Sequence, residues 1–173
     1  MSSPRPPAEG LQSAYDRLQE RLGQVTRVRL STVRAADFRR FAVACDHLDP
    51  VVMDDAAAVA AGLPSSVAPP SFVSSVMGWG EGPPSGELRP DGTGGDPLSG
   101  LPVEGLRLVG AGQQVEIHGP VVDGTELHLE ITLEEVQLKQ GRSGELVLLK
   151  IRKRFLDGHD RQLVVCDETF IGR

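Results

Sequence analysis

The chain has 173 residues, a hydrophobic fraction of 39% and a formal net charge of −6. These values favour one domain with an ordinary core, and they argue against nucleic acid as the main partner because phosphate binding needs a basic surface. No apolar run is long enough to cross a bilayer or to act as a signal peptide, so we expect a cytoplasmic protein with no membrane partner.

The N-terminal half predicts mainly helices. Residues 1–10 are polar and proline-rich, which predicts a disordered terminus and leaves 11–173 as a single domain. Apolar residues recur at helical spacing in 11–22, and a short strand is expected at 25–30. Three more helices are expected. They cover an apolar stripe that runs from Phe38 to Cys45, a small capped helix at 55–61, and a buried helix at 71–77 that begins at two prolines.

Residues 78–105 differ in kind from the rest of the chain. They are dense in glycine and proline, and Trp79 is their one aromatic residue. A loop of this length inside a compact domain is usually functional or disordered. The sequence leaves two interpretations open, a flap that covers a substrate or contacts a partner, and a disordered loop.

The last seventy residues predict strands. Apolar residues alternate in 113–118, 127–133, 147–155 and 163–171, and Asp157-Gly158 is a strong hairpin signal. The basic cluster at 150–154 is expected to form a solvated strand face. Helices followed by long antiparallel strands predict an α+β domain with a helix packed on one face of a sheet.

Residues 41–54 read FAVACDHLDPVVMD. This segment resembles, without a gap, the helix-to-loop signature F-A-x-A-x-G-D-x-N-P-x-H-x-D of MaoC-like hydroxyacyl-thioester hydratases and dehydratases. Segments 57–72 and 109–125 are similar to the N-terminal-type subunits of this family, in the same order. The resemblance covers residues 30–173 and implies a hot-dog fold, in which a curved antiparallel sheet wraps a central helix. The helix at 11–22 is then an extra N-terminal element.

The resemblance also implies a reaction. In this family a carboxylate and an imidazole move the protons when water is added to or removed from an acyl thioester. A backbone N–H at the start of the central helix stabilises the thioester oxyanion. We therefore expect an acyl thioester of coenzyme A or of an acyl carrier protein as ligand. Another hot-dog chain is the expected partner, in a homodimer or a heterodimer.

This chain departs from the family at each of these positions. The catalytic carboxylate falls on His47, the glycine before it on Asp46 and the asparagine on Asp49. The catalytic histidine falls on Val52, which cannot transfer a proton, and the oxyanion glycine falls on Pro70, which has no N–H. Proton transfer contributes about 10²–10⁴-fold and an oxyanion donor about 10²–10³-fold, so the chain should be a poor hydratase alone.

The expected acyl channel follows from the same correspondence. Its substrate-binding residues are predicted to be Val52, Pro70, Ser71, Phe72 and Trp79. The two cysteines and four histidines show no metal-ligand spacing, and no phosphate-loop or dinucleotide pattern is found. We expect neither a metal nor a cofactor.

Three functional hypotheses remain open. The first is a degenerate, N-terminal-type subunit that binds the acyl thioester beside a catalytic chain, in fatty-acid, polyketide or acyl-CoA metabolism. The second is a stand-alone enzyme that uses His47, oriented by Asp46 or Asp49, to dehydrate, isomerise or cyclise a polyketide-like substrate. The third is a binding module without chemistry. His47 has its own structural interpretation, as a histidine that satisfies the C-terminal end of a helix.

Overall fold

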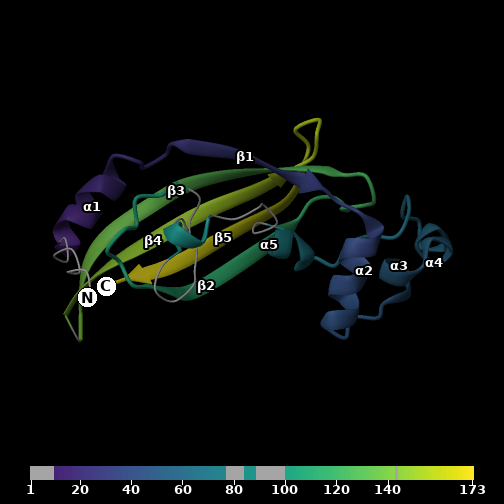
Figure 1. The fold of residues 1–173 in the computed structure, drawn as a ribbon, viewed down its shortest axis with the longest axis horizontal. Coiled ribbons are helices and arrows are strands. Elements are labelled where there is room, and N and C mark those ends of the chain that lie inside the picture. The colour runs from purple at the N-terminus through teal and green to yellow at the C-terminus, as the bar shows by residue number, and fades with distance from the viewer. Residues whose placement is uncertain (1–9, 77–83, 89–99, 143) are drawn as a thin grey trace.

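A curved, five-stranded antiparallel sheet organises the chain (Figure 1). The structure, a computed structural model, describes residues 10–76, 84–88, 100–142 and 144–173. The strand order is β1-β3-β4-β5-β2. The strands are β1 (Val25–Thr32), β2 (Leu108–Ile117), β3 (Glu126–Gly141), β4 (Gly144–Leu156) and β5 (Gln162–Gly172). Strands β1 and β2 therefore form the two edges of the sheet.

The helices occupy three places around this sheet. They are α1 (Leu11–Gln19), α2 (Ala35–Ala44), α3 (Pro50–Met53), α4 (Asp55–Ala60) and α5 (Phe72–Ser75), with a 3₁₀ turn η2 at Ser85–Glu87. Figure 1 shows α1 near one end of the sheet and the group α2–α4 beyond the other end, with α5 between them. The short helix α3 was not predicted, because a proline at its first position reads as a break although proline fits there.

The core lies on one face of β3, β4 and β5. Leu127, Leu129, Ile131 and Leu133 of β3 are at most 2% exposed, as the period-two pattern predicts. They lie beside an equally buried row on β4, which includes Val147, Leu149, Ile151 and Phe155. Each such side chain contributes about 1.5–3 kcal/mol when it leaves water, so these rows fix the register of the sheet.

Three phenylalanines join α5 to α2. The ring of Phe72, fully buried in α5, meets the rings of Phe38 and Phe41 edge to face, with centroid distances of 6.0 and 5.7 Å. Aromatic pairs prefer this arrangement because a positive ring edge meets a negative face. Phe72 therefore packs into the core instead of lining an open channel, and it holds α5 in place.

The predicted fold class is confirmed, with some differences in detail. The helix expected at 71–77 is a single turn, α5, in the described residues. The expected disordered terminus falls largely on residues 1–9, which lie outside the described residues. Most of the loop at 78–105 also lies outside the described residues. Its end packs into the core through Leu101 and Val103, which are 5% and 2% exposed. Among the described residues, no helix has the length and apolarity to span a membrane.

Candidate functional site

The end of α2 places Asp46 and His47 in a tight turn. The N–H of His47 donates to the carbonyl of Ala42 (2.8 Å), and the N–H of Asp46 donates to that of Val43 (3.2 Å). Asp46 has a φ of +55°, the left-handed conformation that usually selects glycine at this position. The resemblance places the family's glycine on this residue. His47 is exposed, and its backbone closes the helix end.

Replacing Asp46 with glycine should stabilise the protein. The left-handed conformation costs a residue with a Cβ about 1–2 kcal/mol. Glycine removes this cost, but it also makes the unfolded chain more flexible, which offsets part of the gain. We expect Asp46→Gly to raise the free energy of unfolding by about 0.5–1 kcal/mol in urea denaturation. Ala44→Gly, two residues earlier in α2, is the matched control and should lower it by about 1 kcal/mol. Equal destabilisation by both substitutions would rule out strain at Asp46.

The next two site positions belong to α3. Asp49 caps this helix, because its carboxylate accepts a hydrogen bond from the N–H of Val51 at 3.0 Å. Val52 is 2% exposed and packs in the core cluster with Phe38 and Phe72. An apolar, buried side chain therefore stands where the resemblance places the catalytic imidazole.

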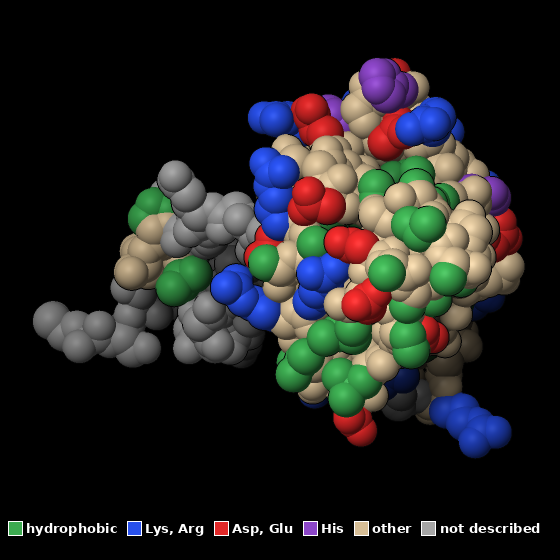
Figure 2. Space-filling model, turned by 90° about the vertical axis from the view of Figure 1, so that its right-hand side faces the viewer, with side chains coloured by type: hydrophobic (Ala, Val, Ile, Leu, Met, Phe, Trp, Pro, Cys, Tyr) green, Lys and Arg blue, Asp and Glu red, His purple; other side chains and the backbone are tan. Residues whose placement is uncertain are grey.

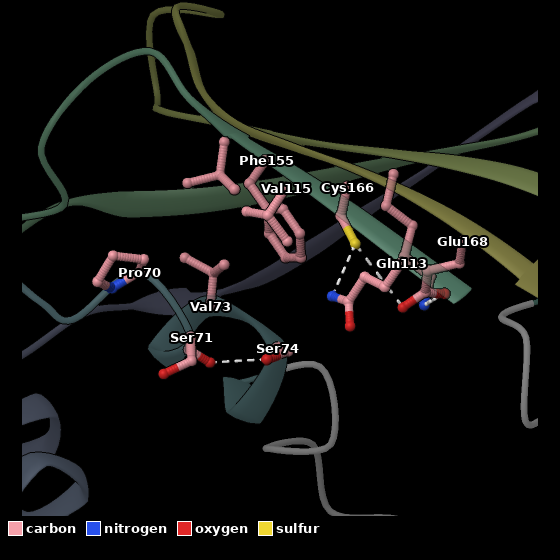
Figure 3. A pocket seen from close by; sticks show the side chains of 11 residues that line it. Pro70, Ser71, Val73, Ser74, Gln113, Val115, Phe155, Cys166 and Glu168 are labelled. Carbon is pink, nitrogen blue, oxygen red and sulfur yellow. Dashed lines mark hydrogen bonds and ion pairs between the residues drawn. The ribbon is translucent and has the colours of Figure 1, made fainter. Parts of the chain in front are cut away.

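A pocket of about 350 Å³ lies between α5 and the inner face of the sheet. Pro70 and Ser71 line one side of it, and Figure 3 shows Gln113, Val115 and Cys166 on the side of the sheet. Its full lining is Pro70, Ser71, Val73, Ser74, Gln113, Val115, Lys153, Phe155, Val164, Cys166 and Glu168. A second pocket of about 360 Å³ shares Pro70, Val73 and Val164 and reaches His118.

The predicted site residues are only partly brought together. Pro70 and Ser71 line the first pocket, whereas Phe72 and Val52 lie in the core. The three catalytic candidates, His47, Asp46 and Asp49, line neither of these two pockets. They belong to the α2–α4 end of the molecule, where Figure 2 shows hydrophobic, acidic and basic side chains interspersed. Trp79 lies outside the described residues.

The pocket contains a polar group that sequence reasoning missed. Lys153 of β4 and Glu168 of β5 form a diagonal ion pair, with 2.5 Å between Nζ and Oε2, and the Lys153 side chain is 6% exposed. The expectation that 150–154 forms a solvated face is therefore wrong for Lys153. Side chains alternate along a strand, so Lys153 points inward with Ile151 and Phe155.

Polar side chains interact differently on the two faces of β4 and β5. On the outer face Arg152 donates two hydrogen bonds of 2.8 Å to Asp167, and these lower the pKa of that carboxyl group. On the inner face Gln113 donates to the sulfur of Cys166 at 3.0 Å. Burial is the main cause that raises the pKa of the Cys166 thiol, so the thiol stays neutral near pH 7.

No cluster of three or more metal-ligating side chains occurs in the part of the chain that the structure describes. The neutral thiol, an amide and one ion pair give the pocket a mixed apolar and polar wall. Such a wall can hold an apolar chain and orient a polar group on it.

Comparison with known proteins places the chain in a family. The profile of the family "FAS1-like, dehydratase domain region" matches residues 21–166. The chain belongs to this dehydratase family. No sequence in the set of curated proteins matches the chain.

Solved structures give the same fold for this dehydratase-family chain. The ChsH1-ChsH2 complex from Mycobacterium tuberculosis matches with a TM-score of 0.72 and 23% identity, over 93% of this chain and 89% of that chain. The HadBC (3R-hydroxyacyl-ACP dehydratase) complex from the same organism matches with 0.67 and 19%, over 87% and 96%. The (R)-hydratase from A. caviae matches with 0.61 and 17%, over 86% and 94%. These likenesses confirm the hot-dog fold, and the family profile confirms the resemblance to dehydratases.

Proposed function

We propose that this chain is a degenerate subunit of a hot-dog dehydratase or hydratase. It binds an acyl thioester of coenzyme A or of an acyl carrier protein and pairs with a catalytic hot-dog chain. The observation that carries the proposal is the burial of Val52, 2% exposed, at the position of the family's histidine. A side chain without a titratable group cannot act as general acid or base.

Two other features support the loss of chemistry. His47, at the carboxylate position, is exposed and lines neither described pocket. Pro70, at the oxyanion position, lines the acyl pocket but has no N–H to donate. The left-handed backbone of Asp46 supports the gapless correspondence from which these assignments follow, because the family has glycine there.

The exposure of strand β2 supports the proposal that a partner chain pairs with this edge. Nine of its ten residues are exposed, and Val109, Val115 and Ile117 are 55%, 44% and 59% exposed. Glu116 is its one charged residue, whereas Arg27 and Arg29 give the opposite edge strand, β1, a charged row of the kind that protects an edge from pairing. The pocket also ends at β2, through Gln113 and Val115, so a chain paired there would complete its wall. Both complexes named above, ChsH1-ChsH2 and HadBC, are heterocomplexes of hot-dog chains.

Hydration of a crotonyl thioester by the purified chain tests the proposal. We expect a rate at least ~10⁴-fold below that of a hot-dog hydratase with an intact dyad, since proton transfer and oxyanion stabilisation are both missing. His47→Ala should leave the residual rate unchanged. A rate within about tenfold of the intact enzyme would contradict the proposal. If that rate were lost in His47→Ala, the chemistry would belong to a stand-alone enzyme based on His47.

A further inference from the structure

The charged pair Lys153–Glu168 sets this acyl pocket apart from an ordinary hydrocarbon channel. Lys153 is 5% exposed as a residue, and the Glu168 side chain is 17% exposed. Removing a lysine and a carboxylate from water is costly even when they are paired, and apolar residues of similar volume often replace such a pair without loss of stability. Since stability does not require the pair and both residues lie in the pocket wall, the pair points to a ligand contact.

Much of the remaining pocket wall is apolar and would suit an unsubstituted acyl chain. Val73, Val115, Phe155 and Val164 line the same pocket and supply apolar surface. A saturated chain would pack against these side chains, but where it passes Lys153 it would exclude water from the ammonium without offering a hydrogen-bond acceptor. The pocket is therefore better suited to a chain that carries a polar group at this depth.

The chemistry of the pair limits what that group can be. A lysine ammonium has three N–H donors, and Glu168 is its ion-pair partner among the described residues. Because Glu168 balances the charge of Lys153, a ligand carboxylate would bring a second negative charge into a largely buried site. A neutral oxygen, as in a ketone or an alcohol, accepts a hydrogen bond without that penalty. Gln113 lies on the same wall and can supply a further amide contact.

We propose that Lys153 makes this pocket selective for acyl chains that carry a neutral oxygen substituent. The ammonium of Lys153 donates to the ligand oxygen, while Glu168 holds the ammonium in position. The inference rests on the proposed binding of an acyl thioester and names the class of acyl group. A site built to donate a hydrogen bond rejects the analogue that lacks the acceptor.

This proposal is tested by calorimetric titration of saturated pantetheine thioesters into the chain. Any hot-dog partner that co-purifies with the chain is kept in the sample. The probes are hexanoyl pantetheine, a series of oxo-substituted hexanoyl pantetheines, and a half-thioester of a dicarboxylic acid of the same length. Saturated chains are used because they cannot be hydrated during the measurement. We expect at least one oxo compound to bind at least ~10-fold more tightly than the hexanoyl and the carboxylate compounds.

Substitutions test whether Lys153 and Glu168 cause the preference for oxo compounds. Lys153→Met/Glu168→Leu removes both charges and should bind hexanoyl and oxo-hexanoyl compounds equally, or prefer hexanoyl. Lys150→Met, on the outer face of β4, should keep the preference of the unmodified chain. Equal binding of all thioesters by the unmodified chain, or a preference that survives the double substitution, would overturn the inference and leave the proposed function standing. If no thioester binds, the proposed function fails as well.

Discussion

Lys153→Met will lower the free energy of unfolding by about 3–5 kcal/mol. The substitution leaves the Glu168 carboxylate, 17% exposed as a side chain, without the ammonium that lies 2.5 Å away. An uncompensated charge inside the protein is far more costly than the pair is stabilising, because desolvation is no longer offset. Urea denaturation followed by circular dichroism measures the loss, as a shift of the midpoint at constant slope.

Two further variants separate charge from packing. Lys150→Met removes the ion pair of an exposed lysine with Glu135 on the outer face, and it should cost less than about 1 kcal/mol. Lys153→Met/Glu168→Leu should recover most of the loss, because no charge stays buried. Equal losses in Lys153→Met and Lys150→Met would show that the inner pair is solvated, and the assignment of a polar pocket wall would then be wrong.

Charging the edge strand β2 will separate the chain from its hot-dog partner. Val109→Lys/Ile117→Lys replaces two side chains that are 55% and 59% exposed. Each apolar contact in a buried interface contributes on the order of 1.5 kcal/mol, and the lysines must also be desolvated. We expect the dissociation constant to rise at least ~100-fold, measured by analytical ultracentrifugation of the complex.

The opposite edge provides the matched control. Val25→Lys/Val28→Lys on β1 replaces side chains that are 59% and 37% exposed, and it should leave the dissociation constant unchanged. All four positions are exposed in the isolated chain, so its unfolding should change by no more than about 0.5 kcal/mol per position. If the β1 variant dissociates the complex and the β2 variant does not, the partner pairs at the other edge.

The sequence predicts the fold where hydrophobic periodicity is regular. Leu127 to Leu133 specify the inner face of β3 because side chains alternate on a strand and one face is buried. The strand nevertheless continues to Gly141 through polar residues such as Lys139 and Gln140. A register shift between Leu133 and Glu135 moves the apolar alternation onto Val136 and Leu138, and the polar residues beyond them are held by pairing with β4.

The site is harder to read because its parts come from different strands. The inward direction of Lys153 follows from the alternation of Val147, Leu149 and Ile151, but its partner Glu168 lies on β5. Only the register of β4 against β5 brings the two together, and a local pattern does not contain that register. The resemblance assigns the departures at His47 and Val52 through the gapless motif at 41–54, and the departure at Pro70 through the similar segment 57–72, so these proposals need no structure.

We propose that a partner chain does the chemistry. This proposal is tested by crotonyl-thioester hydration in a complex of this chain with a co-purified hot-dog chain that has an intact dyad. We predict that the complex is active, that replacing the partner's carboxylate and imidazole reduces the rate at least ~10²-fold, and that His47→Ala has no effect. Activity that survives loss of the partner's dyad and disappears in His47→Ala would contradict the account.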